Sequence, residues 1–483
     1  MGKKKKATKP VEKTQAKSPE STNVVVLGDE QVEGAEPLVA ADAAEVAVVA
    51  DAAEATDAAG IAEASDAVAP APIAPMTVPV MTPDELTAHI LEAGGAIEDS
   101  IIAMRRYFHA HPELSTKEVA TSNSICVRLT RMGIPYERVA KTGIIATIKG
   151  EAPDAYDDQG NPRRRIALRA DIDALPVTEE TGLPYESQNT GVMHACGHDC
   201  HIAMMLGAAR ILNDMRSQLH GEVRIIFQPA EEISIGSRMM IRAGALEGVD
   251  GLFGMHIWSD VEAGKISCAP GQRMANTDWF RIDVAGVSAH GSMPHKGVDA
   301  IVVAAELVNV IQTLVSRDIS PFEPLVVTVG EIHGGEARNI MAGSAYLTGT
   351  VRTWTEKTRK SIPEHLEHLV KRTAKALGAR AKLTYEEGNA GLVNDAASAA
   401  RAEQAVVKLF GEDALSDYQG TLAGEDFAEY LKIVPGVFAF VGCRNPKVGA
   451  EHPQHSCFYR VDESALVRGS EFAAQYAVDF LAE

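Results

Sequence analysis

The sequence predicts an α/β protein in which a larger domain with a central, mostly parallel sheet carries a smaller α+β domain inserted into it. Short apolar runs typical of strands alternate with helical patterns over much of the chain, as expected for a parallel sheet covered by helices. Between residues 278 and 388 the order becomes β-α-β-β-α-β, which predicts a ferredoxin-like fold. We therefore expect a tail over 1–81, the larger domain over 82–277 and 389–483, and the insertion over 278–388.

The first expected helix follows Thr82 and ends near Phe108. Thr82, Pro83 and Glu85 supply an N-cap, a proline at the first helical position and a capping-box glutamate. The larger domain is predicted to contain strands at 144–148, 166–169, 223–227, 252–257 and 437–441 and helices at 202–215 and 237–243. The insertion is predicted to contain strands at 280–284, 325–329, 346–351 and 381–385 and helices at 300–315 and 357–377.

The first 81 residues differ in composition from the rest. A basic head with four lysines at 3–6 precedes a mixture of Ala, Val, Asp and Glu over 29–70 that contains no aromatic residue. This composition predicts a disordered tail, with a partner-binding or membrane-surface arm as the alternative. The basic head is not followed by the apolar core of a signal peptide.

Composition restricts the class of protein. The formal net charge is −20 and no basic stripe occurs in the 483 residues, which argues against a nucleic-acid partner. Six cysteines without a cleavable signal pattern favour a reducing compartment, and we expect the cytoplasm. No run of 18 or more apolar residues is present, so we expect no membrane-spanning helix and no membrane partner.

Residues 194–201, with the sequence HACGHDCH, place several possible metal ligands beside a glycine. Other polar residues follow predicted strands: Asp171 and Asp173 follow one, Glu231 and Glu232 follow another, and His256 closes a third. Open α/β sheets bind ligands at the carboxyl ends of their strands. We therefore expect these groups to meet at one crevice.

Five residues are the candidate metal ligands: Cys196, His198, Glu232, His256 and His455. An isolated His or Cys is more often a satisfied polar group or a small core residue, but five converging ligands exceed what one tetrahedral zinc uses. Two ions that share a bridging group therefore fit better. Cys200 and His201 are expected to point away from the site, although a shift of one helical turn would let Cys200 substitute.

Glu231 and Glu232 are adjacent, and adjacent side chains at a strand end diverge. One can therefore bind metal while the other transfers protons between water and a leaving nitrogen.

Six stretches together resemble the M20 metallopeptidase family, and within it the amidohydrolase branch of auxin-conjugate, hippurate and N-acyl-amino-acid hydrolases. They are RRYFHAHPELSTKE (105–118), LRADIDALPV (168–177), HACGHD (194–199), FQPAEE (227–232), GMHIW (254–258) and SAHGSMPHKGVDAI (288–301). The resemblance extends from about Thr82 to Glu483.

The resemblance implies a role for each matching residue. Cys196, His198, Glu232, His256 and His455 match the ligands of two divalent ions, either Mn²⁺ or Zn²⁺, and Glu231 matches the general base. His290 resembles a histidine that reaches the active site of a neighbouring subunit, which implies a homodimer. Asn339 and Arg352 resemble the pair that holds the carbonyl and carboxylate of the substrate. His333, Gly334 and Gly335 receive no role, and Cys457 stands where the branch often has proline.

The expected activity is metal-dependent hydrolysis of the amide bond in a small N-acyl or N-aroyl amino acid. A metallo-dipeptidase, aminopeptidase or carboxypeptidase of the same family is the alternative enzyme, although the sequence identifies no acidic group for a free α-amine. A non-catalytic metal-binding protein is the alternative outside enzymes, and it would be expected to lose Glu231 or a ligand first.

Overall fold

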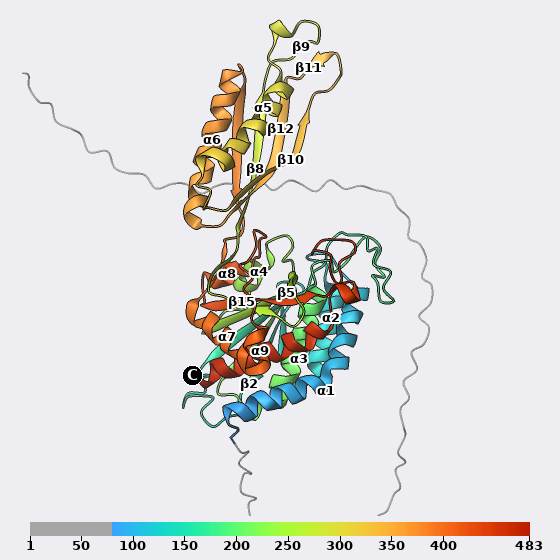
Figure 1. The fold of residues 1–483 in the computed structure, drawn as a ribbon, viewed down its shortest axis with the longest axis vertical. Helices are drawn as coiled ribbons and strands as arrows, with labels where there is room; N and C mark the ends of the chain where they lie inside the picture. Colours follow the sequence, from blue (N-terminus) through green and yellow to red (C-terminus); the bar gives the residue numbers. More distant parts are fainter. Residues whose placement is uncertain (1–79) are drawn as a thin grey trace, which may run out of the picture. The chain divides into compact units, whose positions relative to one another are not determined.

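The computed structural model describes residues 80–483, and the predicted tail lies outside them except for its last two residues. Within this range the larger sheet has the strand order β1-β2-β4-β3-β5-β15-β6 (Figure 1). Its strands are β1 Tyr136–Val139, β2 Gly143–Lys149, β4 Glu222–Gln228, β3 Arg165–Asp171, β5 Gly251–Glu262, β15 Gly436–Arg444 and β6 Ile266–Ser267. The central strands β4, β3, β5 and β15 are mutually parallel, and the flanking strands are antiparallel to their neighbours. The predicted central, mostly parallel sheet is therefore confirmed.

Helices cover both faces of this sheet (Figure 1). On one face lie α1 Pro83–Ala110, α2 Val119–Arg131, α3 His198–Asp214, α7 Ala396–Phe410 and α9 Ser464–Ala482; on the other lie α4 Gly236–Arg242 and α8 Ala428–Leu431. Strand β3 shows why both faces are covered. Ile166 and Leu168 belong to the core beneath α3 and α9, whereas Ala167 between them belongs to the core beneath α4 and α8. Strands buried on both faces are typical of parallel sheets.

Helix α1 begins as its sequence predicts. The Thr82 hydroxyl accepts a hydrogen bond from the Glu85 backbone N–H, and the Glu85 carboxylate accepts one from the Thr82 N–H at 2.8 Å. This reciprocal capping box satisfies two N–H groups that the first turn would leave unpaired.

Residues 276–387 form an inserted lobe with its own antiparallel sheet in the order β10-β12-β8-β13. Its elements are β8 Asn276–Ala285, α5 Ala300–Thr313, β10 Leu325–Gly334, β12 Ser344–Thr353, α6 Glu356–Ala376 and β13 Arg380–Glu387. Their chain order is the β-α-β-β-α-β order expected from the sequence, and both helices pack on this sheet around a separate core. Two small ribbons pair β9 Ala289–His290 with β11 Ile340–Met341, and β7 Gly271–Met274 with β14 Leu392–Asn394. The exact domain boundaries remain predictions.

One segment among the described residues, 300–318, is long and apolar enough by composition to cross a membrane. It consists of α5 and the turn that follows it. Leu307, Ile311 and Leu314 of this segment are buried in the core of the inserted lobe. Because the core helix of a folded lobe has the same composition, this finding is weak evidence for a membrane span.

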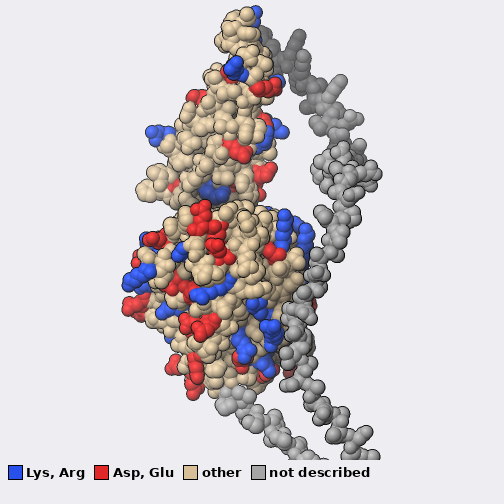
Figure 2. Space-filling model, turned by 90° about the vertical axis from the view of Figure 1, so that its right-hand side faces the viewer, with Lys and Arg blue, Asp and Glu red and all other residues tan. Residues whose placement is uncertain are grey.

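Acidic and basic side chains are interspersed over the larger lobe and the inserted lobe on the face drawn in Figure 2.

The structure corrects the predicted end of one strand. His256 was expected to close its strand, but β5 continues to Glu262. The reason is unequal pairing: β3 accompanies β5 only as far as Gly254, whereas β15 accompanies it to Glu262. His256 therefore lies beyond the last residue that β3 pairs.

Candidate metal centre and active site

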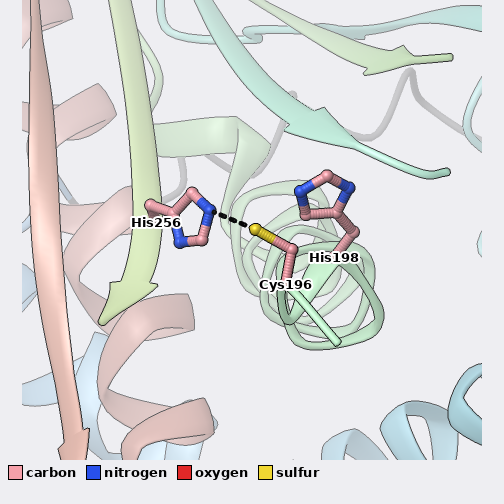
Figure 3. A group of neighbouring side chains, drawn as sticks. All are labelled: Cys196, His198 and His256. Atoms are coloured by element: carbon pink, nitrogen blue, oxygen red, sulfur yellow. Dashed lines mark hydrogen bonds between the residues drawn. The ribbon is translucent and has the colours of Figure 1, made fainter. Parts of the chain in front are cut away.

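Three candidate ligands come from two elements that meet at the carboxyl ends of the parallel strands. Cys196 and His198 stand at the start of α3, and His256 projects from β5 towards them (Figure 3). Gly197 between the first two has φ of +90°, and a Cβ there would collide with Ile257. A glycine therefore lets the chain turn sharply into the helix and places both neighbours at one site.

The structure brings all five candidate ligands together. Cys196 Sγ lies 3.4 Å from His256 Nε2, and His198 Nε2 lies 3.8 Å from Glu232 Oε1. His455 Nε2 lies 3.7 Å from Glu232 Oε2, although the His455 side chain is 58% exposed. The possible ligand atoms form overlapping groups within 4.8 Å: Cys196 with His198 and His256, and Cys196 with Glu232 and His455. Because Cys196 belongs to both groups, its sulfur lies near ligand atoms of all four other candidates.

Hydrogen bonds fix the two buried imidazoles. His198 Nδ1 lies 2.9 Å from the carbonyl oxygen of Asp173, and His256 Nδ1 lies 2.7 Å from that of Ile257. Since a carbonyl can only accept, each Nδ1 carries a proton, so Nε2 is the ring atom that can bind a metal ion once it is deprotonated. Carbonyl partners of this kind commonly orient histidine ligands.

Asp173 also fixes the two glutamates. Its carboxylate oxygens accept hydrogen bonds from the backbone N–H groups of Glu231 and Glu232, at 3.1 Å each, and from the Ser115 hydroxyl at 2.6 Å. The buried Asp173 therefore holds the turn after β4 in place while its backbone holds His198.

The site fits divalent cations. The Nε2 of His198 and the Oε1 of Glu232 are fully enclosed and lack any hydrogen-bond partner among the described residues. Buried polar atoms rarely stay unpaired, and N, O and S donors of this kind suit zinc and related ions.

Negative charge dominates this part of the protein. Burial raises the pKa of Glu232 to about 7, and burial together with Glu425 and Glu232 raises that of Glu231 well above its ordinary value. Burial lowers the pKa of His198, but Asp171, Asp173 and Glu232 outweigh it and raise the value to about 10. Without cations these groups retain protons, and metal binding releases protons from such ligands.

The structure corrects the prediction for His201. Cys200 points away from the cluster, towards Arg105 and Cys443, as expected, but the His201 ring lies 4.4 Å from the His256 ring and 5.4 Å from the His198 ring. His201 follows His198 by three residues in α3, and side chains at this spacing lie on the same side of a helix. Its Nε2 accepts a hydrogen bond from the Ile257 N–H at 2.9 Å.

A buried network explains the first motif of the family resemblance. The Asp199 carboxylate lies 2.8 Å from Arg105 Nε and 2.8 Å from His109 Nδ1. Arg105 and His109 belong to α1, so this network attaches the start of α3 to α1 at the residue that follows His198.

Four of the five candidate ligands border a cavity of about 450 Å³. The cavity wall includes Cys196, Glu231, Glu232, His256 and His455 from the larger lobe and Thr277, Trp279 and Arg352 from the inserted lobe. Trp258, Met274 and Gln454 also line it. Of the predicted substrate-binding pair, Arg352 therefore reaches this cavity.

Two acidic residues that the sequence analysis did not select stand beside Glu231. Glu425 and Asp426 each have an oxygen in a group with Glu231 within 4.8 Å. Both are salt-bridged to the buried Arg169 of β3, at 2.9 and 3.0 Å. In the sequence they appear only as an acidic pair between Gly424 and Phe427. This pair belongs to no periodic pattern and has no spacing typical of metal ligands.

His290 and Asn339 lie together but do not line the cavity. The Gly291 N–H donates to the Asn339 carbonyl at 2.9 Å, and His290 pairs with Ile340 in the β9–β11 ribbon. His290 is exposed, and its Nδ1 accepts a hydrogen bond from the Ser292 N–H at 3.1 Å. In the neutral ring the proton therefore resides on Nε2, which leaves an exposed N–H donor. His333 is exposed and stacks on Tyr346 at 4.8 Å.

Comparison with known proteins decides the family. The model of peptidase family M20/M25/M40 matches residues 167–479. The chain belongs to this family. It is a metal-binding enzyme that hydrolyses amide bonds.

Individual relatives cover most of this M20 protein. An N-acetyl-L-cysteine deacetylase of Bacillus subtilis (strain 168) is 37% identical over 79% of this chain and 88% of its own. An N-acyl-L-amino acid amidohydrolase of Geobacillus stearothermophilus is 40% identical over 65% of this chain and 82% of its own. The crystal structure of the Bacillus subtilis YXEP protein, described as a dinuclear metal-binding peptidase of the M20 family, is 35% identical with a TM-score of 0.69 and covers 80% of this chain and 99% of its own.

Proposed function

We propose that this M20 enzyme hydrolyses the amide bond of small N-acyl or N-aroyl amino acids with two divalent cations. One observation carries the proposal: four of the five metal-ligand candidates border a single cavity together with the carboxylate of Glu231 and the guanidinium of Arg352, and the fifth, His198, lies 3.8 Å from Glu232. This combination provides a proton carrier and a cation for the substrate carboxylate. The names of the deacetylase, the amidohydrolase and the dinuclear peptidase support the same reaction class and the same number of ions.

Cys196, His198, Glu232, His256 and His455 would hold the ions. Cysteine and histidine favour Zn²⁺ by their softness, and Mn²⁺ is the alternative implied by the amidohydrolase branch. When bound, such ions lower the pKa of water towards neutrality and polarise a carbonyl group.

Glu231 transfers the proton. Its side chain lines the cavity and is not required as a ligand. Its backbone N–H donates to Asp173, and its Oε1 accepts a hydrogen bond from the Asp426 N–H at 3.4 Å. It accepts a proton from the attacking water and delivers it to the nitrogen as the C–N bond breaks. The products are a carboxylic acid and an amino acid.

Arg352 binds the free α-carboxylate of the substrate. Burial lowers the pKa of Arg352, with Asp278 opposing this effect, and the guanidinium makes no salt bridge within the described residues. A carboxylate can therefore form a bidentate pair with it.

His290 and Asn339 complete the site of a second subunit in a homodimer. Both are absent from the lining of the cavity in their own chain, and the exposed Nε2–H of His290 is a suitable donor for a developing oxyanion. The six cysteines are all unpaired, which supports the cytoplasm as the location.

The test is a hydrolysis screen of metal-reconstituted protein. N-acetyl, N-benzoyl and indole-acetyl amino acids are compared with free dipeptides, and the released amino acid is measured. We expect the N-acyl compounds to be cleaved and the dipeptides to be poor substrates. Cleavage of dipeptides alone would establish the peptidase alternative, and metal retention without any turnover would establish a binding protein.

A further inference from the structure

Glu425 is a buried carboxylate at the wall of the cavity that the mechanism above does not use. Its side chain is 1% exposed, yet it borders the same cavity as Glu231. It stands in the loop between α7 and α8, more than 190 residues after Glu231 in the sequence.

The two oxygens of Glu425 have different surroundings. Oε1 accepts hydrogen bonds from Arg169 Nη2 at 2.9 Å and from the Phe427 N–H at 2.8 Å. Oε2 accepts no hydrogen bond from any residue that the structure describes, and it is not among the fully enclosed unpaired atoms. The contacts to Oε1 therefore fix the carboxylate while Oε2 borders the cavity as a free acceptor.

Asp426 provides the contrast. It uses the same Arg169, but Oδ1 also accepts from Gln228 Nε2 at 2.7 Å and Oδ2 accepts from the Ser237 N–H at 2.9 Å. Both of its oxygens are satisfied, and it does not line the cavity. Asp426 therefore holds the loop, whereas Glu425 presents an unused acceptor to whatever occupies the cavity.

The closeness of Glu425 to Glu231 indicates which group this acceptor meets. One carboxylate oxygen of Glu231 and one of Glu425 lie within 4.8 Å of each other. Two acceptors at this spacing can both reach one nitrogen at hydrogen-bond distances of about 2.9 Å. The nitrogen that receives the proton from Glu231 is the scissile nitrogen of the substrate.

We propose that Glu425 accepts a hydrogen bond from the N–H of the scissile amide and so makes the enzyme selective for amides over esters. This inference rests on the proposed function. The amide nitrogen enters with one hydrogen, directed at Glu425, and Glu231 adds a second that came from water. The C–N bond then breaks, its electron pair stays on nitrogen, and the remaining water proton passes from the new carboxylic acid to the amine. The products are a carboxylate and an ammonium ion.

An ester of the same shape lacks this donor. O-acetyl-L-lactate differs from N-acetyl-L-alanine by an oxygen in place of the N–H, so its lone pairs would face the Glu425 carboxylate. The ester therefore loses an attraction and gains a repulsion.

Glu425→Gln changes the acceptor while keeping the shape. The glutamine carbonyl can still accept from Arg169 and Phe427, which directs its NH₂ group into the cavity in place of Oε2. A donor then faces the scissile nitrogen. We expect kcat/KM for N-acetyl-L-alanine to fall by about 10- to 100-fold, the effect of losing a hydrogen bond to a charged group, while kcat/KM for the ester stays constant or rises. Glu425→Ala is a second variant, and it too should leave kcat/KM for the ester unchanged.

Asp426→Asn is the matched control. It weakens the contacts with the same Arg169 but leaves the cavity wall unaltered. It should therefore change kcat/KM for the amide and for the ester by the same factor. A purely structural role for Glu425 would likewise lower both activities together. Metal content is measured for every variant. In the Glu231→Gln background, calorimetry should show weaker binding of N-acetyl-L-alanine, but not of the ester, when Glu425 is also replaced by Gln.

The outcomes separate the two proposals. If the wild-type enzyme hydrolyses no N-acyl amino acid, the proposed function fails. If it does, and the amide-to-ester ratio is the same in wild type and Glu425→Gln, this inference alone is wrong. Selective loss of cleavage of free-amine dipeptides would show instead that Glu425 receives an α-ammonium group, which also overturns it.

Discussion

The Nδ1 atom of His201 lies 2.5 Å from the Oδ1 atom of Asp171. The Ile257 N–H donates to the other ring nitrogen, so the Nδ1 of His201 carries the proton and donates it to the carboxylate. Burial lowers the pKa of His201, although Asp171 opposes this effect, and the ring is a neutral link between β5 and β3. Asp171 also stands 3.7 Å from His198 Nε2, so this link supports the metal site without supplying a ligand.

The first prediction concerns this link. His201→Leu should weaken metal binding by about 10- to 100-fold, because residues that orient ligands have effects of this size. Competition with a chelator gives the affinity. Cys200→Ser is the neighbouring control on the side of α3 that faces away, and it should keep wild-type affinity. Equal affinities for His201→Leu and wild type would show that His201 acts only in packing.

The second prediction concerns the number of ions. Saturated protein should contain close to two divalent ions per chain, because the five ligands exceed one tetrahedral set. Cys196→Ser should lower both metal content and activity, since a hydroxyl is a far poorer ligand than a thiolate. Elemental analysis is the measurement, and a content that never exceeds one would refute the two-ion site.

The third prediction separates the two adjacent glutamates. Glu231→Gln keeps size and hydrogen bonding but removes the proton carrier, so kcat should fall by about 10² to 10⁴ with metal content unchanged. Glu232→Gln should lose metal instead. Steady-state kinetics and elemental analysis are carried out on both variants. Loss of metal in Glu231→Gln but not in Glu232→Gln would show that the two roles are exchanged.

The fourth prediction concerns stability and lies away from the site. Glu471 of α9 is buried against Gly94 of α1, and burial raises its pKa to about 7, with Arg468 opposing and Glu98 reinforcing this shift. Between its ordinary pKa near 4.5 and about 7, the folded protein binds more protons at this position than the unfolded chain. This group therefore destabilises the fold progressively as the pH rises through that window.

Glu471→Gln removes the ionisation. The variant should match wild type near pH 4 and exceed it at pH 8 by about 1–3 kcal/mol, a range that allows for solvent screening. Chemical denaturation at fixed metal concentration measures the difference. Glu92→Gln, on the exposed surface of α1, is the control for removing one carboxylate from the surface. A constant difference between Glu471→Gln and wild type from pH 4 to 8 would contradict the assignment.

The fifth prediction tests assembly through His290. A His290→Ala chain and a Glu231→Gln chain should each be nearly inactive alone. Half of the dimers in an equilibrated mixture pair the two chains, and each such dimer has one site with both wild-type groups. The mixture should therefore recover roughly a quarter of wild-type activity. Absence of recovery despite proven subunit exchange would place His290 outside the partner's chemistry.

The sequence was sufficient for the parts of the fold and site that follow periodicity or spacing. The buried strands, the capping box at Thr82 and the five candidate ligands each follow a local pattern. Helix α9 was not predicted; its side chains are buried on most sides, so no polar face separates it from a buried apolar run. Glu425 was missed for another reason. Its salt bridge to Arg169 of β3 brings it beside Glu231, and local spacing in the sequence does not reveal contacts between segments so far apart.

The position of strand β15 in the chain also determines when the larger sheet can be completed during synthesis. It lies between β5 and β6 in the sheet, yet the ribosome adds it only after the entire inserted lobe. Until then β5 exposes an unpaired edge and β6 has no neighbour within the described sheet, while Glu425 and His455 have not joined the cavity. Strand pairing between such distant segments forms late, and until it forms the unpaired strand edges can pair with other chains. A nascent chain of this enzyme therefore depends on protection from aggregation until its last hundred or so residues emerge.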